Sequence, residues 1–176
     1  EIITHLPDIL HKLNVKTFLD LPCGDFNWMQ KVNMEGIHYT GGDIVQHIIT
    51  SNQEKYGKEN TTFLQLDLIK DDLGAYDMIF CRDCLVHLSF EAIHKAITNI
   101  KKSGSKYLMT TTFPDQSVNE DIITGGWRPL NLEKAPFNFP KPLYVLNEKC
   151  TEMNGAFADK SLSVWEIADL PDPIRV

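Results

Sequence analysis

The chain has 176 residues, of which 43% are hydrophobic and 23% charged, and its net charge is −7. This length and balance are typical of one globular domain with a substantial core. No apolar run approaches the roughly 20 residues that a membrane span needs. A nucleic-acid partner is also disfavoured, because the chain is acidic and Lys101-Lys102 is its only basic pair.

The sequence shows no signal peptide and contains four cysteines, Cys23, Cys81, Cys84 and Cys150. Disulfide frameworks are typical of small secreted proteins, so we expect reduced thiols and a cytoplasmic location. The chain opens with Glu1 rather than Met. We therefore expect the sequence to be a piece of a longer protein. Its length predicts that residues 1–176 form a single domain.

Apolar residues at helical spacing predict a helix over residues 2–13, or one that begins only at Pro7, which suits a first turn. A buried strand is predicted at 16–21, a short helix around 26–32 and a second strand at 37–42. The next apolar face, which runs from Val45 to Tyr56, predicts a helix that Gly57 ends. A third strand follows at 61–66 and a fourth at 76–81.

Ser89 is a good N-cap for a helix that Gly104 closes, and a fifth strand is predicted at 107–112. Strands that alternate with helices indicate a parallel sheet with right-handed crossovers. The pattern changes at 113–142, where five prolines and Gly125-Gly126 exclude a helix. A long irregular segment of this kind is usually functional. Two further strands, at 143–146 and 162–167, are expected to pair antiparallel at one edge of the sheet.

Three acids, Asp20, Asp43 and Asp67, each stand at the carboxyl end of a predicted strand. In open α/β sheets the ligand crevice lies at those ends. Asp43 is placed to bind ribose hydroxyls, and Asp67 to accept a hydrogen bond from the exocyclic amine of adenine. The alternative is that these acids only cap the structure that follows them.

The turn Pro22-Cys23-Gly24-Asp25 does not fit a dinucleotide. A pyrophosphate site needs the pattern G-x-G-x-x-G, but here Pro22 occupies the first glycine position. Asp25 would repel a pyrophosphate at the same place. A cofactor with a positively charged sulfonium meets no such repulsion, so a nicotinamide oxidoreductase is disfavoured.

The stretch Asp20-Leu21-Pro22-Cys23-Gly24 resembles motif I of class I S-adenosylmethionine-dependent methyltransferases, with Pro22 in place of a glycine. Gly42-Asp43, Leu66-Asp67-Leu68 and the strand 76–81 resemble the later motifs in order and spacing. The resemblance implies a Rossmann-like α/β three-layer sandwich, whose mostly parallel seven-stranded sheet has an antiparallel last strand. It also implies S-adenosylmethionine (SAM) as cofactor, bound by Asp20, Pro22, Cys23, Gly24, Asp25, Trp28, Asp43, Ile44, Asp67, Leu68, Cys81 and Arg82.

Residues 81–89 and 125–132 resemble a narrower bacterial and viral subgroup of that superfamily, which is found beside or fused to glycosyltransferases. This resemblance implies O-methylation of a small-molecule or glycan hydroxyl, and a possible fusion to other catalytic domains. Two alternatives stay open: a catalytically inactive, methyltransferase-like binding domain, and a methyltransferase that acts on a protein or another small molecule.

Methyl transfer to a hydroxyl requires alignment of the acceptor and a base for its proton. His87 follows the fourth strand and has the right chemistry, although it is also placed to cap the next helix. Asp83, four residues earlier, is a candidate to orient His87, bind the acceptor or act as the base. A divalent metal held through Asp83 is a further alternative, but the second and third carboxylates for it are not apparent.

Thr112, Trp127 and Arg128 are the candidate acceptor-binding residues. Aromatic faces stack on sugars or rings, and arginine donates a fixed fork of hydrogen bonds. The alternative for Trp127 is that it pins the long loop to the core. Cys81 and Cys84 have the spacing of half a zinc site, but a second pair is missing, so we expect packing groups and no metal.

Overall fold

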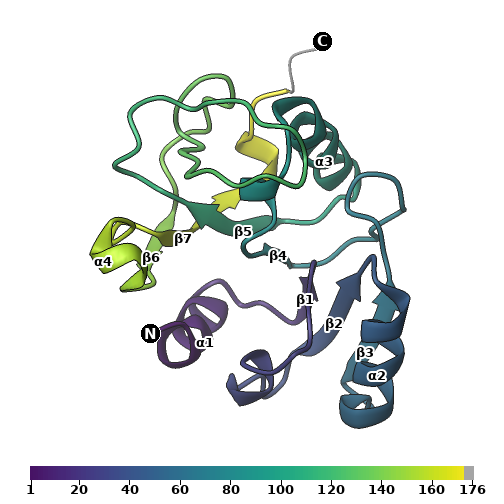
Figure 1. The fold of residues 1–176 in the computed structure, drawn as a ribbon. Coiled ribbons are helices and arrows are strands. Elements are labelled where there is room, and N and C mark those ends of the chain that lie inside the picture. The colour runs from purple at the N-terminus through teal and green to yellow at the C-terminus, as the bar shows by residue number, and fades with distance from the viewer. Residues whose placement is uncertain (173–176) are drawn as a thin grey trace.

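The computed structural model describes residues 1–172 and contains a seven-stranded sheet covered by helices and loops on both faces (Figure 1). Across the sheet the strands are β3 (Thr61–Gln65), β2 (His38–Asp43), β1 (Thr17–Asp20), β4 (Met78–Cys81), β5 (Tyr107–Thr112), β7 (Ser161–Glu166) and β6 (Tyr144–Asn147). β1 to β5 pair in parallel, and β7 is antiparallel to both of its neighbours. The predicted Rossmann-like fold class is confirmed.

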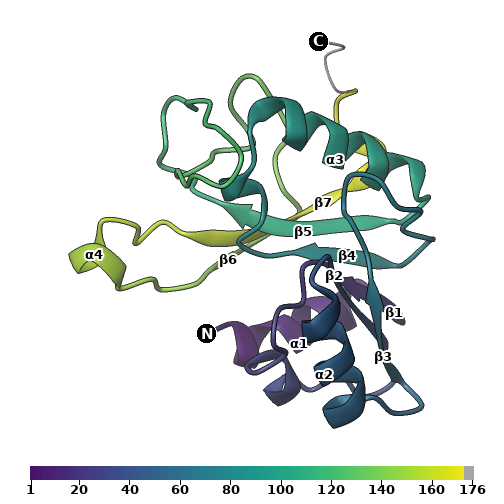
Figure 2. The same ribbon diagram turned by 45° about the vertical axis from the view of Figure 1, so that its right-hand side comes forward.

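The two faces of the sheet are covered differently (Figure 2). Helices α1 (Ile2–Lys12) and α2 (Gln46–Tyr56) lie on one face, and helix α3 (Phe90–Lys102) lies on the other together with the segment 113–143. α3 buries Ile93, Ala96, Ile97 and Ile100 at helical spacing. Its predicted cap is present, since the Ser89 hydroxyl accepts a hydrogen bond from the Ala92 N–H at 3.3 Å. No helix within residues 1–172 is long and apolar enough to cross a membrane.

Helix α1 begins at Ile2, so the alternative start at Pro7 is wrong. The Glu1 carbonyl accepts hydrogen bonds from Thr4 and His5, which builds the first turn before the proline. Pro7 lacks an N–H to continue the pattern, and the helix tolerates that loss because the apolar face that includes Leu6 and Leu10 is buried.

The short helix predicted around 26–32 is wrong in extent: only the 3₁₀ turn η1 (Met29–Lys31) forms. Phe26 has a left-handed backbone with φ of +60°, which a right-handed helix does not allow. Between β6 and β7 the chain was expected to be irregular throughout, but it contains the short turn α4 (Glu152–Gly155). Met153 and Asn154 in that turn are also left-handed.

The segment 113–143 has no helix, as predicted, and hydrogen bonds organise it instead. The Asn131 side-chain amide donates to the carbonyls of Pro114 and Gln116, both at 2.9 Å. The Trp165 indole donates to the Pro140 carbonyl at 2.8 Å. These bonds fix the segment as a packed layer over the sheet, beside α3.

Gly41 in β2 allows close packing beneath the carboxyl edge of the sheet. A Cβ on Gly41 would lie 2.6 Å from Cδ1 of Phe63. The Phe63 ring is buried and packs edge-on against Phe26, with ring centroids 5.1 Å apart. Any displacement of Phe63 therefore reaches the turn that follows β1.

We expect Gly41→Ala to lower the free energy of unfolding by about 1–3 kcal/mol, because it overpacks a filled core. Urea denaturation monitored by circular dichroism measures this change. The control is Ser117→Ala, an exposed loop substitution expected to stay within about 0.5 kcal/mol of the parent. Equal stability of Gly41→Ala and the parent would contradict the close packing at Phe63.

Candidate functional site

A cavity of about 250 Å³ lies where the strand order reverses, between β1 and β4. Ligands of open α/β sheets bind at this place, outside the carboxyl ends of the strands. We name it the β1–β4 cavity. Its lining residues are Asp20, Pro22, Cys23, Gly24, Asp25, Trp28, Asp43, Phe80 and Arg82. All of them except Phe80 are among the residues predicted to bind the cofactor.

The turn after β1 is held by groups from β2 and α2. Gly24 has φ of +54°, a conformation that favours glycine, and its N–H donates to Oδ2 of Asp43 at 3.2 Å. Its carbonyl accepts from the Asn52 side-chain amide at 2.7 Å. The Cys23 N–H donates to the Gly42 carbonyl at 2.7 Å. The turn is therefore fixed with its backbone at the edge of the cavity.

Asp20 is a buried carboxyl group on the floor of the cavity, with 2% of its surface exposed. Burial raises its pKa to about 7, and the neighbouring Asp43 adds to the rise. The hydrogen bond that Oδ2 accepts from the Tyr39 hydroxyl at 2.6 Å, and the positive charge of Arg82, act in the opposite direction. A cation in the cavity would stabilise the ionised form of Asp20.

Burial also determines the state of Cys23, which lines the same cavity. Desolvation, together with the charges of Asp20 and Asp43, raises the pKa of this thiol to about 12. Cys23 is therefore a neutral thiol near neutral pH and is not an activated nucleophile.

Four predicted cofactor residues do not line the β1–β4 cavity: Ile44, Asp67, Leu68 and Cys81. Asp67 follows β3, and its carboxylate caps the turn there, accepting from the Ile69 N–H at 2.9 Å and pairing with Lys70 at 3.2 Å. Leu68 and Cys81 are buried in the core. Ile44 is 60% exposed beside Asp43.

A second cavity, of about 190 Å³, lies beside the loop that follows β4. It is lined by Asp83, His87, Phe113, Trp127, Glu152, Phe157 and Lys160, and we name it the aromatic cavity. The rings of Trp127 and Phe157 meet edge-to-face with centroids 4.8 Å apart, and Phe113 contacts both. Arg82 of the first cavity and Asp83 of the second are consecutive residues.

His87 is exposed and lies in the 3₁₀ turn η2 (Leu85–His87). Its Nδ1 lies 2.8 Å from the Gly126 carbonyl oxygen. A carbonyl only accepts, so Nδ1 carries the proton and the neutral ring keeps the lone pair of Nε2. The carbonyl of Gly126 therefore orients this ring, which was one of the three roles considered for Asp83.

Asp83 has a left-handed backbone with φ of +53°, and its N–H donates to the Thr111 hydroxyl at 2.8 Å. Its carboxylate pairs with Lys160 at 2.8 Å and with Arg82 at 3.2 Å. Asp83 thus forms ion pairs with one residue of each cavity: Lys160 of the aromatic cavity and Arg82 of the β1–β4 cavity.

Of the three predicted acceptor residues, only Trp127 lines the aromatic cavity. Thr112 is buried, and its hydroxyl bonds to the Leu130 carbonyl at 3.2 Å. Arg128 is 6% exposed, and its guanidinium donates to backbone carbonyls on both sides of His87. These two residues hold the long segment in place and do not face the cavity.

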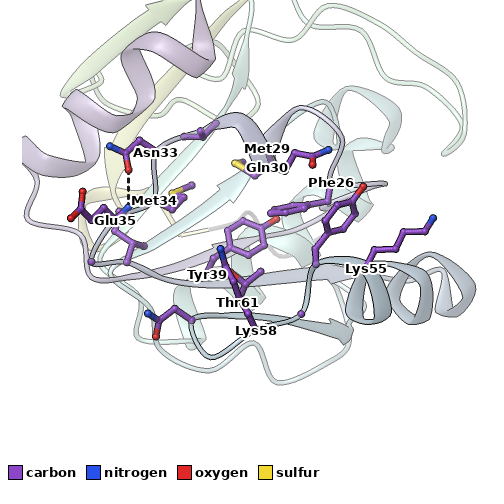
Figure 3. Close-up of a pocket in the computed structure, with 16 residues that line it drawn as sticks. Phe26, Met29, Gln30, Asn33, Met34, Glu35, Tyr39, Lys55, Lys58 and Thr61 are labelled. Carbon is purple, nitrogen blue, oxygen red and sulfur yellow. Dashed lines mark hydrogen bonds between the residues drawn. The ribbon is translucent and has the colours of Figure 1, made fainter.

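A larger hollow, of about 710 Å³, lies at the opposite, amino ends of β2 and β3 (Figure 3). Phe26, Met29, Met34 and Tyr39 line it, with Lys55, Lys58 and Glu35 among its polar groups. Met29 of the single turn η1 is among the residues that line it. Its size fits a ligand, but the acids at the strand ends and His87 lie elsewhere, so we place the candidate active site at the carboxyl edge.

Four residues around the two cavities were not predicted from the sequence: Asn52, Tyr39, Glu148 and Lys160. Asn52 could have been found from the sequence, because a polar residue on the inward face of the predicted helix suggests a buried hydrogen bond. Tyr39 carries no signal beyond its place in a strand. Glu148 and Lys160 flank an irregular segment, and only the paired strands β6 and β7 bring them together.

The described cysteines are all free thiols. Within residues 1–172, no group of three or more His, Cys, Asp or Glu side chains is arranged to hold a metal ion. Cys81 is completely buried, and Cys84 packs against the same core.

Comparisons with known proteins identify the fold. No protein-family model matches the sequence, and no curated protein matches it. Solved structures match: TnmH with a TM-score of 0.68 over 94% of this chain at 12% identity; PigF with SAH at 0.62 over 87% and 18% identity; and human N-acetylserotonin methyltransferase with SAM at 0.60 over 86% and 13% identity.

The chain spans about half the length of these structures: 55%, 50% and 47%, respectively. At such identities the likeness establishes the fold alone. That fold is the class I SAM-dependent methyltransferase fold, with strand order 3-2-1-4-5-7-6 and an antiparallel strand β7.

The raised pKa of Asp20 makes stability depend on pH. In the unfolded chain this group ionises near pH 3.8, whereas in the folded protein it ionises only near pH 7. The contribution of Asp20 to the free energy of unfolding therefore falls as the pH rises from about 4 to about 7, by up to about 1.4 kcal/mol per pH unit, and is constant above that.

Asp20→Asn removes this pH dependence and keeps an acceptor for the Tyr39 hydroxyl. We expect the stability of the variant relative to the parent to increase over this range in urea titrations between pH 5 and 8. Asp25→Asn, an exposed change in the same turn, is the control, and parallel pH curves for Asp20→Asn and the parent would refute the assignment.

Proposed function

We propose that this chain is a SAM-dependent methyltransferase that transfers a methyl group to a hydroxyl of a small molecule or glycan. The observation that carries the proposal is the pairing of two cavities at the carboxyl edge of the sheet. One is lined by Asp20, the Gly24 turn and Asp43, and the other contains His87 with an available Nε2.

The β1–β4 cavity fits such a cofactor. A Cβ on Gly24 would meet nothing within 4 Å, so the backbone of the turn borders open space. Each oxygen of Asp43 accepts one backbone N–H, from Gly24 at 3.2 Å and Val45 at 2.9 Å, which leaves acceptor capacity for ribose hydroxyls. The exposed side chain of Ile44 offers an apolar surface next to Asp43. The adenine role of Asp67 and Leu68 remains a prediction.

When bound, SAM would supply a methyl group already activated by the positive sulfur. The protein then has to align the acceptor and accept its proton. Nε2 of His87 is the base in this proposal. The hydrogen bond from Nδ1 to Gly126 fixes the tautomer and stabilises the protonated ring once the proton has moved.

The aromatic cavity favours an uncharged acceptor with a flat face. Phe113, Trp127 and Phe157 offer ring surfaces on which a sugar or an aromatic ring packs. Lys160 is paired with Asp83, and Glu152 adds a further negative charge, so the cavity does not attract phosphate groups. Human N-acetylserotonin methyltransferase, whose name states a small-molecule acceptor, has a similar fold. The sugar hydroxyl is the narrower form of the proposal and rests on the resemblance of residues 81–89 and 125–132.

Calorimetry with SAM, S-adenosylhomocysteine (SAH) and NAD tests the cofactor assignment. We expect SAM and SAH to bind and NAD to bind more weakly or not at all. Asp43→Ala should weaken SAM binding by about tenfold or more, because ribose hydroxyls lose a charged acceptor. Asp72→Ala, at an exposed acid outside the cavity, is the matched control. Preferential NAD binding, or unchanged SAM affinity in Asp43→Ala, would overturn the assignment.

His87→Ala tests the base. We expect it to bind SAH with the affinity of the parent and to lower SAH production by about 10²–10⁴-fold with a hydroxyl acceptor, the usual contribution of general base catalysis. The assay screens neutral glycosides and phenols for SAH release. His94→Ala, on α3 outside both cavities, controls for loss of a histidine. If saturating acceptor restored full turnover to His87→Ala, His87 would not be the base. SAM binding without turnover of any acceptor would instead favour the inactive binding domain.

A further inference from the structure

Four charged side chains form a closed ring of ion pairs at the carboxyl edge of the sheet. Arg82 pairs with Glu148 at 2.7 Å, Glu148 with Lys160 at 3.6 Å, Lys160 with Asp83 at 2.8 Å, and Asp83 with Arg82 at 3.2 Å. Each charge therefore has two neighbours of opposite sign. The members come from the loop after β4, the segment just after β6 and the residue before β7.

The ring lies between the two cavities. Arg82 lines the β1–β4 cavity, and Asp83 and Lys160 line the aromatic cavity. Glu148 lines neither of them, yet it is the least exposed member, with 7% of its side chain accessible. An acid so deeply placed is stable as an anion only when it is well paired. Arg82 and Lys160 supply that pairing.

The bonds between Glu148 and Arg82 fix the orientation of the guanidinium. Nε and Nη2 of Arg82 donate to the two oxygens of Glu148 at 3.3 and 2.7 Å, the fork geometry that restricts both groups. The guanidinium carbon lies 5.4 Å from the centroid of the Trp28 ring. Arg82 keeps further N–H donors on its terminal nitrogens, because an arginine has about five in all.

Through these contacts Glu148 influences the position of Arg82 in the β1–β4 cavity, although Glu148 itself does not line that cavity. The cavity holds Asp20 and Asp43, and Arg82 is its one lining cation among the described residues. An amino-acid portion of a ligand carries both a carboxylate and an ammonium group. Arg82 is the group that suits the carboxylate, while the acids suit the ammonium.

We propose that Glu148 is a positioning residue for the cofactor: it holds the guanidinium of Arg82 at the orientation in which the cavity receives the carboxylate of SAM or SAH. This inference rests on the proposed function. Lys160 supports Glu148 from the other side. The Glu148 N–H also donates to the Lys160 carbonyl at 2.9 Å, which closes the loop that carries Glu152 and Phe157.

A double-mutant cycle on SAH binding tests the proposal. The variants are Glu148→Gln, Arg82→Met and the double variant, with circular dichroism to confirm folding and calorimetry to measure the dissociation constant for SAH. We expect Glu148→Gln to weaken SAH binding by about five- to tenfold, within the range of coupling between contacting residues. In the Arg82→Met background the same change should have little further effect, because the group that Glu148 positions is gone.

A merely structural role for Glu148 would lower affinity by the same factor in both backgrounds, and that result would overturn the proposal. Unchanged SAH affinity in Glu148→Gln would overturn it too.

Should Glu148→Gln fail to fold, Glu148→Asp replaces it in the same cycle, since it keeps the charge but shortens the reach to Arg82. Glu133→Gln, which removes the pair with Lys141 at 2.7 Å, is the control and should bind SAH as the parent does. Failure of the parent protein itself to bind SAH would refute the proposed function and this inference with it, whereas normal binding by the parent isolates the role of Glu148.

Discussion

The guanidinium group of Arg128 donates hydrogen bonds to the carbonyls of Leu85, Val86 and Leu88 at 2.7–3.0 Å, and the aromatic cavity depends on these bonds. His87 lies between the bonded carbonyls, so the same contacts fix the loop that carries it. The segment 113–143 has no helix whose hydrogen bonds would pair its backbone N–H and carbonyl groups. A buried arginine instead joins this segment to the η2 turn, and the desolvation that lowers its pKa is offset by several hydrogen bonds.

The β1–β4 cavity depends on a comparable constraint. Asp43 receives the N–H of Gly24 on one oxygen and that of Val45 on the other, so one carboxylate joins the turn after β1 to the start of α2. Asn52 of α2 holds the Gly24 carbonyl from the opposite side. Both cavities are therefore formed by irregular chain that polar side chains tie to the sheet, and the sheet sets the places at which they are tied.

Most of the fold follows from local sequence patterns. Short apolar runs predict the buried strands, and an amphipathic pattern with a serine cap predicts α3. Both signals lie within a few neighbouring residues. Asp20 and Asp43 at the strand ends both line the β1–β4 cavity, since parallel strands bring their carboxyl ends to one edge, whereas Asp67 does not line it. Phe26 was not predicted to be left-handed, because tertiary packing against Tyr39 and Phe63 fixes its conformation.

The acceptor side shows where local patterns do not suffice. Trp127 and Arg128 were both expected to face the acceptor, but these adjacent side chains have different surroundings. Trp127 lines the cavity, while Arg128 turns inward to the carbonyls. The ring of ion pairs joins Arg82 to Glu148 across 66 residues and Asp83 to Lys160 across 77. Contacts at such separations depend on the pairing of β5, β6 and β7, which no window of the sequence contains.

The balance of charge in the β1–β4 cavity bears on how tightly the proposed cofactor and its demethylated product bind. Among the described residues, Asp20, Asp25 and Asp43 line the cavity with one cation, Arg82, so the cavity carries a net negative charge when Asp20 is ionised. Transfer of a methyl group converts a positively charged sulfonium into an uncharged thioether. An electronegative cavity binds the cation better than the neutral product, because the Coulomb attraction is lost with the charge. Since burial raises the pKa of Asp20 to about 7, the size of this difference changes near neutral pH. Arg82 offsets part of this negative charge, and its own charge is paired with Glu148 and Asp83. The ring that fixes this arginine therefore acts on the charge of the cavity as well as on its shape.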